Sequence, residues 1–519
     1  MIRKTTSPST STDTAEAPAT PPYSLPVPPT GALSAHDTTY VADARRGGDT
    51  GRAAHEPGIA SPTGTMRRRL SIGLVVLACA YPVASLNVQG VANGMLFLFA
   101  LIGLFSLPTL TGRGMPPQVR GSLVGIAILG WLPFVAALAN EVARVHWVPR
   151  NLDLPLRFAL LGPCIACACR IGVQRGRHLQ WGLIGASMFC GAREIYVNFG
   201  VARVSEVGLI NTIPYSDVTL TFGFLTLMTL GWTLAGPQRP RLAAIETLLK
   251  VLAFVVALGG SVASGSRGGW LAIPVLGALS WYALALRATP GNGAACSDTP
   301  IVAHSRRALP VLIVLGAALG LWHAWPRLTE AFSNIAVFLQ GGHFNTPIGI
   351  RFEVWRASVM MLAQHPLVGV GYDQFMPTLA ALIGEGKIPA VLLGLPHSHN
   401  DMLFALATTG SLGGIALLSL YLVPFGKCLR WTLEARTREA RCLAAMGTAL
   451  PLSYLVYGLT ETMFIISMDT ALFVFMSALL LALARAATLV SVASDTLPDI
   501  DARQRDSRVR AAADRRTGG

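Results

Sequence analysis

Apolar runs of roughly 20 residues, separated by short polar or basic stretches, follow one another from about residue 70 to residue 487. A run of this length is what an α-helix needs to cross the hydrocarbon core of a bilayer. The pattern predicts an all-α polytopic membrane protein with about 12 transmembrane helices. The candidate spans are residues 70–86, 90–108, 121–139, 152–169, 179–197, 213–235, 247–264, 269–286, 309–326, 402–424, 443–463 and 468–486.

Composition excludes the soluble classes of protein. Charged residues make up 13% of the chain and hydrophobic residues 52%, whereas a soluble domain carries about 25% charged residues. The 41 Lys and Arg exceed the 27 Asp and Glu, but they cluster between apolar runs and form no basic stripe typical of nucleic-acid binding. We therefore expect membrane lipids, and no nucleic acid, among the partners.

The basic clusters also predict an orientation. Loops that would be cytoplasmic if the amino terminus is inside carry more Arg and Lys than the opposite loops, as the positive-inside rule requires. With an even number of spans, both termini lie in the cytoplasm. Residues 1–65, rich in Ser, Thr, Pro and Gly, are predicted to be a disordered tail, and residues 488–519 a disordered basic tail.

A segment of unusual length divides the spans. Residues 66–326 hold predicted helices one to nine, residues 327–400 follow on the outer face, and residues 401–487 hold helices ten to twelve. Loops this long are usually functional or disordered. Because residues 327–400 contain several large apolar side chains, we expect a helical periplasmic domain, and we expect the catalytic site there.

Two histidines stand at the end of this segment. His397, His399 and Asn400 belong to the run P-H-S-H-N-x9-G-x-x-G, which ends at Gly413. An imidazole exchanges protons near neutral pH, so the two histidines offer a candidate general base, and His397, His399 and Asn400 are candidate contacts of the substrate. The structural alternative is that these residues cap the tenth span.

Several arginines are candidate phosphate ligands. Arg351 lies four residues before Trp355, on the same face of a predicted helix, and a guanidinium group suits phosphate oxygens. Arg267, in the tight turn Ser266-Arg267-Gly268, lies at membrane depth, where an ionisable side chain is usually functional. Arg203 and Arg193, in or near the outer segment after the fifth predicted span, are further candidates of the same kind. Pairing with acidic side chains or lipid headgroups is the alternative for each, as it is for Arg356.

Metal-dependent transfer would require clustered carboxylates for Mg²⁺ or Mn²⁺. The outer segments offer only scattered acidic residues, and Asp499-Ile500-Asp501, which resembles a nucleotide-sugar motif, lies in the predicted cytoplasmic tail. We expect a site with no metal and no cofactor.

These motifs, together with the twelve-span layout, resemble the bacterial O-antigen ligase and polymerase family. The match covers S-R-G at Ser266, the R-x3-W and H-P-L-x-G-x-G run of residues 351–371, and the histidine run of residues 396–413. The resemblance implies a GT-C-like fold, a donor glycan on undecaprenyl diphosphate, His399 as the motif histidine, and Arg267 and Arg351 as its essential arginines.

The predicted activity is O-antigen ligation, with lipid A-core as the acceptor. Two alternatives stay open. An O-antigen polymerase would join lipid-linked repeat units, and a transporter or flippase for a lipid-linked sugar would place ionisable residues near the bilayer midplane. Glu461, assigned to the eleventh span, is the main feature that favours transport.

Overall fold

The computed structural model describes residues 62–108, 117–145, 147–200, 204–236, 238–285, 325, 329, 332–337, 340 and 345–491. Within these residues the protein is almost entirely helical, and a single short antiparallel pair, β1 (Glu206–Val207) and β2 (Ile210–Asn211), interrupts the helices. Nearly all of the predicted span at 309–326 and most of the predicted tails lie outside the described residues.

Seven helical segments in the described part of the chain are long and apolar enough to cross a membrane. The prediction of an all-α polytopic membrane protein is thus confirmed in its class. The segments are Arg68–Asn87, Gly121–Arg144, Pro149–Ala168, Pro240–Ser264, Arg267–Ala285, Asp401–Glu434 and Ser467–Ser491.

Other predicted spans are helical but less clearly membrane-spanning. α10 (Leu179–Asn198), α11 (Thr212–Met228) and α19 (Arg438–Tyr457) occupy three of them, and α3 (Val91–Leu104) is a shorter apolar helix. Each of these helices is too short or too polar to be identified as membrane-spanning from its length and hydropathy alone. The number twelve therefore stays a prediction.

Some boundaries differ from those that hydropathy predicts. α2 (Pro62–Asn87) begins ahead of residue 66, and the final helix continues to Ser491, beyond residue 487. The span predicted at 121–139 is divided into α5 (Pro117–Leu129) and α6 (Leu132–Arg144), and that at 152–169 into α7 (Asp153–Ala159) and α8 (Leu161–Ala168). Pro133 at the start of α6 contributes to the first division, because it has no backbone N–H to continue a helix.

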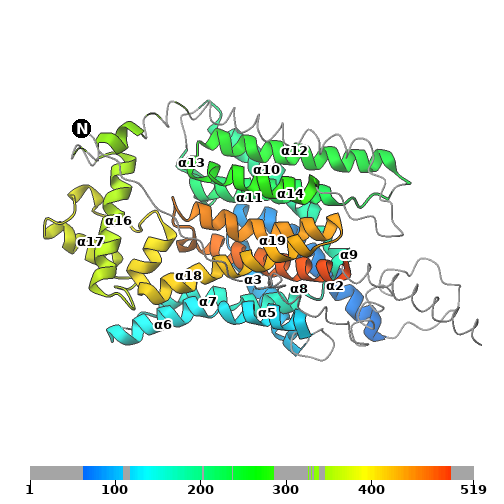
Figure 1. Ribbon diagram of the computed structural model, residues 1–519, viewed down its shortest axis with the longest axis horizontal. Helices are drawn as coiled ribbons and strands as arrows, with labels where there is room; N and C mark the ends of the chain where they lie inside the picture. The colour runs from blue at the N-terminus through cyan, green and yellow to red at the C-terminus, as the bar shows by residue number, and fades with distance from the viewer. Residues whose placement is uncertain are drawn as a thin grey trace, which may run out of the picture.

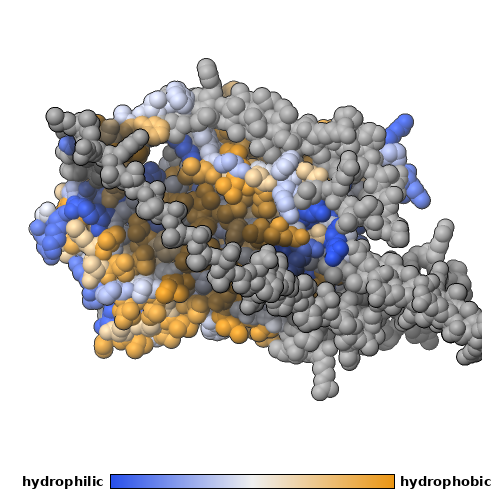
Figure 2. All heavy atoms as spheres, in the orientation of Figure 1, coloured by the Kyte–Doolittle hydropathy of each residue, from blue (hydrophilic) through white to orange (hydrophobic). Residues whose placement is uncertain are grey.

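The helices form one elongated bundle (Figure 1). α11 lies at its centre, with nearly every residue from Thr212 to Met228 buried, and packs against α10, α19 and α12 (Pro240–Ser264). α18 (Asp401–Glu434) packs along α19, and α14 (Ala272–Ala285) covers the other side of α19. Figure 2 shows apolar side chains over the middle of the bundle, as a lipid-facing surface requires.

A helical unit covers one end of the bundle. It consists of α16 (Pro347–Gln364), α17 (Phe375–Gly384) and the loop leading to α18, and it has its own hydrophobic core, which includes Val354, Phe375 and Phe404. The described part of the long outer segment is therefore helical and packed, as expected. We call the end of the bundle formed by this unit, α13 (Arg267–Trp270) and the start of α18 the site end (Figure 1).

The glycine motifs join this unit to an interruption in α18. Gly410 has φ 66° and ψ −161°, and residues 366–371 lie along the interruption, where Val370 N–H donates to the carbonyl of Ala407 at 2.9 Å. A Cβ on Gly369 would collide with the backbone at Thr408 and Thr409, and one on Gly410 with that of Leu367. The close approach and the positive φ of both residues, 69° and 66°, together explain why both positions are glycine.

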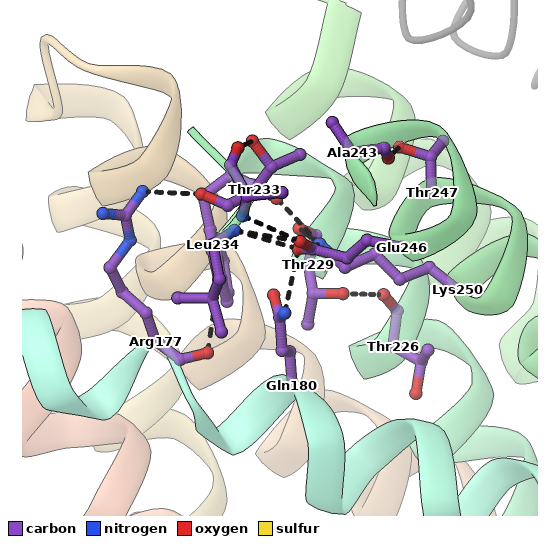
Figure 3. A network of polar contacts seen from close by, with 12 residues as sticks. Arg177, Gln180, Thr226, Thr229, Thr233, Leu234, Ala243, Glu246, Thr247 and Lys250 are labelled. Atoms are coloured by element: carbon purple, nitrogen blue, oxygen red, sulfur yellow. Dashed lines mark hydrogen bonds and ion pairs between the residues drawn. The ribbon is translucent and has the colours of Figure 1, made fainter. Parts of the chain in front are cut away.

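At the opposite end of α11 and α12, a network of polar contacts stabilises the turn between these two helices (Figure 3). The buried Lys250 ammonium donates to the carbonyl oxygens of Thr229 and Trp232 and to Glu246, at 2.7 to 3.0 Å. Glu246 in turn accepts from the backbone N–H groups of Leu234 and Ala235. The two charges thus pair with each other and satisfy the orphan groups at a helix end, which is a structural role.

Candidate functional site

The centre of the site is a contact between His399 and Glu461. His399 lies in the loop just before α18, and Glu461 in the connection between α19 and the final helix. The Nδ1 atom of His399 lies 3.1 Å from Oε1 and 3.3 Å from Oε2 of Glu461. The His399 side chain remains 25% exposed, whereas that of Glu461 is 8% exposed. A buried carboxylate therefore holds one ring nitrogen, and the ring is still accessible.

This contact fixes the chemical state of the ring. A carboxylate that accepts from Nδ1–H selects the tautomer in which Nε2 has a free lone pair. The carboxylate also stabilises the imidazolium that forms when Nε2 takes a proton. The arrangement suits His399 to act as a general base through Nε2.

The backbone around His399 is held in an unusual conformation. His399 has φ 50°, in the left-handed region that residues other than glycine rarely adopt. Asn400 on its carboxyl side maintains it, since its backbone N–H donates to Thr462 Oγ1 and its Nδ2 to the carbonyl of Leu459, both at 3.1 Å. Backbone strain of this kind persists only where the surroundings impose it, and it is often found at functional sites.

Asn400 therefore has a clear structural role. Its Oδ1 also accepts from the N–H of Leu403 and so caps α18. The capping alternative considered for this part of the chain thus applies to Asn400, and its contact with substrate stays a prediction. The side chain of Asp401, buried next to it, accepts from Tyr421 and from the N–H of Phe464.

Glu461 carries a negative charge at neutral pH. Burial alone would raise its pKa, but the hydrogen bond from His399 and one from the N–H of Thr462 lower the pKa below 4.5. The sequence placed Glu461 in the eleventh span and gave it no catalytic role. The structure places it in the loop that follows Tyr457, because α19 ends at that residue.

His397 lies against the same pair but is bonded differently. Its Nδ1 accepts the backbone N–H of His399 at 3.3 Å, and the two rings meet edge to face with centroids 4.4 Å apart. Burial, together with the neighbouring His399, lowers the pKa of His397 to about 4, despite the carboxylate of Glu461. His397 is thus neutral at pH 7, with its proton on Nε2.

Arg267 reaches the site end through α13. Gly268 packs directly on the side chain of Thr460, which precedes Glu461, and a Cβ at Gly268 would collide with it. Ser266 Oγ donates to Asp217 of α11 at 3.2 Å. The S-R-G motif thus lies where two helices meet the Glu461 loop, the connection between α19 and the final helix. The small glycine allows the backbone at Arg267 to lie next to that loop.

Arg351 lies on α16, which packs against the loop of residues 396–400 that holds the two histidines. One turn further along the same face, Trp355 Nε1 donates to the carbonyl of Ser398 at 3.0 Å, which fixes α16 against the residue between the two histidines. The Nε of Arg351 is buried and has no hydrogen-bond partner among the described residues. Arg351 is thus a cation with donor capacity left for an anionic ligand.

The other arginines have different surroundings. Arg356 pairs with Glu353 at 2.6 Å and donates to the carbonyl of Lys387, as the ion-pair alternative proposed. Arg193 donates to Asn87 at 3.0 Å. Arg203 lies outside the described residues, so its predicted role is not tested.

A small, mostly apolar pocket that is partly open to solvent adjoins the site. Side chains of α7, α18 and the Glu461 loop line it, including Phe158, Phe404, Leu417 and Phe464, and its polar lining includes Asp401 and Thr462. These two residues also flank the His399–Glu461 pair. An apolar ligand group bound there would lie beside the catalytic candidates.

Part of the chain matches a known protein family. Residues 252–418 match the O-antigen ligase family. The matched segment contains Arg267, Arg351, His397 and His399, whereas Glu461 lies beyond it. This confirms the resemblance that the motifs indicated, and it supports glycosyl transfer of the O-antigen ligase or polymerase type.

A curated relative extends the similarity beyond that segment without naming an activity. The chain is 20% identical over 309 residues to a Haemophilus influenzae (strain ATCC 51907 / DSM 11121 / KW20 / Rd) protein described as uncharacterized. The aligned residues cover 59% of this chain and 73% of the relative.

Proposed function

We propose that this chain is an O-antigen ligase, which transfers a glycan from undecaprenyl diphosphate to lipid A-core at the periplasmic face of the bacterial inner membrane. The observation that carries the proposal is the hydrogen bond between His399 Nδ1 and the buried carboxylate of Glu461. Such a pair activates a hydroxyl group, and the acceptor sugar supplies one.

The proposed reaction is a displacement at the anomeric carbon of the first sugar. His399 Nε2 takes the proton of the acceptor hydroxyl, the hydroxyl oxygen bonds to the anomeric carbon, and the bond from that carbon to the diphosphate oxygen breaks. The diphosphate leaves with the electron pair. Arg267 of α13 and Arg351 of α16 neutralise the charge that grows on it.

The chemistry of these side chains supports a mechanism without metal. Guanidinium groups supply the positive charge that Mg²⁺ supplies in other transferases. The buried Nε of Arg351, which has no hydrogen-bond partner in the part of the chain that the structure describes, supports this assignment. The apolar pocket beside Asp401 supports a donor with a polyprenyl chain, since an apolar chain bound there would place its diphosphate near the site.

Two other functions remain to be tested against this one. A polymerase would use the same donor and base, with a second lipid-linked repeat unit as acceptor. For a transporter, Glu461 was the main support, but a carboxylate bonded to His399 in a loop at the site end favours catalysis.

Lipopolysaccharide from a deletion strain distinguishes these functions. For a ligase we expect full-length glycan to accumulate on its polyprenyl carrier and lipid A-core to stay bare. A single repeat unit on lipid A-core would indicate a polymerase, and retention of the carrier-linked glycan on the cytoplasmic face would indicate a transporter. Complementation with His399→Ala, at equal protein level, should not restore the wild-type banding pattern, whereas His365→Ala, which changes an exposed histidine, should restore it.

A further inference from the structure

His397, His399 and Glu461 converge on one point. One possible ligand atom from each side chain lies within 4.8 Å of the other two. Oε1 of Glu461 lies 3.1 Å from Nδ1 of His399 and 3.8 Å from Nδ1 of His397. Within the described part of the chain, this is the only group of three or more His, Cys, Asp or Glu side chains so arranged.

The 3.1 Å separation is close to that of two ligand atoms on one transition-metal ion, whereas the 3.8 Å separation would have to shorten as the ion binds. A tetrahedral Zn²⁺ with bonds of about 2.0 to 2.1 Å needs ligand atoms about 3.3 Å apart. Two imidazole nitrogens and one carboxylate oxygen form a common zinc ligand set, which leaves the fourth position open. Mg²⁺ and Ca²⁺ prefer oxygen ligands and would bind poorly here.

The surroundings permit an ion to bind. Both histidine side chains are partly exposed, at 17% and 25%, so an ion can reach them from the site end. Coordination by Nδ1 of His397 would replace only a 3.3 Å hydrogen bond from the backbone of His399. Oε1 of Glu461 also accepts from the backbone N–H of Thr462. This hydrogen bond orients the carboxylate, in the way that a hydrogen-bond partner outside the ligand shell orients a metal ligand.

We propose that His397, His399 and Glu461 form a binding site for Zn²⁺ or a similar divalent transition metal, and that the bound ion inhibits the enzyme. The inhibition rests on the proposed function. A metal on Nδ1 of His399 displaces the proton that this atom donates to Glu461. The neutral ring then carries its single proton on Nε2, so Nε2 can no longer accept the proton of the acceptor hydroxyl.

Metal binding can be measured without any glycan. Purified full-length protein in nanodiscs, without an affinity tag and freed of metal by a chelator, is titrated with Co²⁺ and then with Zn²⁺ in competition. We expect the visible ligand-field bands of tetrahedral Co²⁺ and their loss when Zn²⁺ is added. His397→Ala and Glu461→Gln should each weaken binding by more than the roughly 10- to 100-fold that loss of an outer partner costs. His365→Ala should bind like the wild type.

Transfer assays test the inhibition separately. Zn²⁺ should stop transfer by the wild type, EDTA should restore it, and the residual activity of His397→Ala should resist the same Zn²⁺ concentration. Metal binding that survives both His397→Ala and Glu461→Gln would overturn the site, whatever the transfer assay shows. Unchanged transfer by fully zinc-loaded protein would overturn the inhibition. A protein that binds Zn²⁺ as described but transfers no glycan in either form would contradict the proposed function and leave the site standing.

Discussion

The Nδ1 atom of His399 lies 3.1 Å from a carboxylate oxygen of Glu461, although 62 residues separate them in the chain. Three features converge on this contact: the left-handed backbone of His399, the bonds of Asn400 to the Glu461 loop, and the burial of Glu461. The ring can therefore neither turn freely nor exchange its tautomer without losing the contact. The first prediction follows from this constraint.

Glu461→Gln should lower kcat for glycan transfer more than it raises KM. An amide keeps the shape of the side chain but loses the charge that stabilises imidazolium, so the loss should approach, without exceeding, the roughly 10²- to 10⁴-fold expected for His399→Ala. Steady-state kinetics on lipid-linked donor measure both constants. Glu461→Asp should recover part of kcat, and equal KM and kcat effects in Glu461→Gln would contradict a positioning role.

Arg267→Ala and Arg351→Ala should each reduce transfer by roughly 10²- to 10³-fold, because each removes a donor to the leaving diphosphate. Lys at either position should restore little, since it keeps the charge but not the planar fork. Arg356→Ala is the matched control on α16: it breaks the ion pair with Glu353 and should leave transfer nearly intact. Equal losses in Arg351→Ala and Arg356→Ala would mean that Arg351 acts through folding alone.

How far the sequence predicts this site depends on the range of each interaction. Hydropathy is a local property, so it identified the helical membrane class and the helical nature of the outer segment. It could not resolve where single spans divide, as between α5 and α6, because Pro133 acts within an otherwise continuous apolar run. Composition likewise did not show that the eleventh predicted span ends at Tyr457, so that Glu461 lies in the loop that follows it.

The motifs identified candidate side chains but not their partners. The histidine run and the family resemblance predicted His399 as the base, whereas its contact with Glu461 depends on how α18 and α19 pack. The same holds for the glycines: the run that includes Gly369 was visible as a pattern, but only the structure shows that it lies against the interruption of α18. In the sequence, Glu461 was visible only as an acidic residue near the end of an apolar run. That pattern supports a transporter as much as it supports catalysis.

Gly410→Ala should destabilise the protein and prevent complementation. Its positive φ is unfavourable for alanine, and the added Cβ would collide with the backbone at Leu367. Gly426→Ala provides the control in the same helix, since a Cβ there meets nothing within 4 Å. Thermal unfolding in detergent should show a lower midpoint for Gly410→Ala and no decrease for Gly426→Ala. Wild-type stability in Gly410→Ala would show that the two segments can move apart freely.

The predicted orientation can be tested with reporters that are active only in the periplasm. A fusion after Glu385, which follows α17, should be active, and one after Arg436, between α18 and α19, should be silent. Because α18 separates the two positions and is long enough to cross a membrane, the results should be opposite. The reverse pattern would place His399 in the cytoplasm and remove the basis for a periplasmic reaction.

The last prediction concerns stability in acid. Burial and the neighbouring His399 lower the pKa of His397 from 6.5 to about 4, so between these values the folded protein binds fewer protons at this site than the unfolded chain. Stability rises with pH wherever the unfolded state binds more protons. His397 therefore contributes full stability above pH 6.5 and progressively less as the pH falls toward 4, by at most about 1.4 kcal/mol per pH unit.

His397→Asn should remove this dependence. Unfolding midpoints measured between about pH 7 and about pH 5.5 keep Glu461, whose pKa is lowered below 4.5, mostly ionised in both the folded and the unfolded state. We expect the wild type to lose stability across this interval and His397→Asn to lose less, while His365→Asn, at an exposed position, follows the wild type. If His397→Asn and the wild type show the same slope, the His397 ring is better solvated than its contacts with His399 and Glu461 indicate.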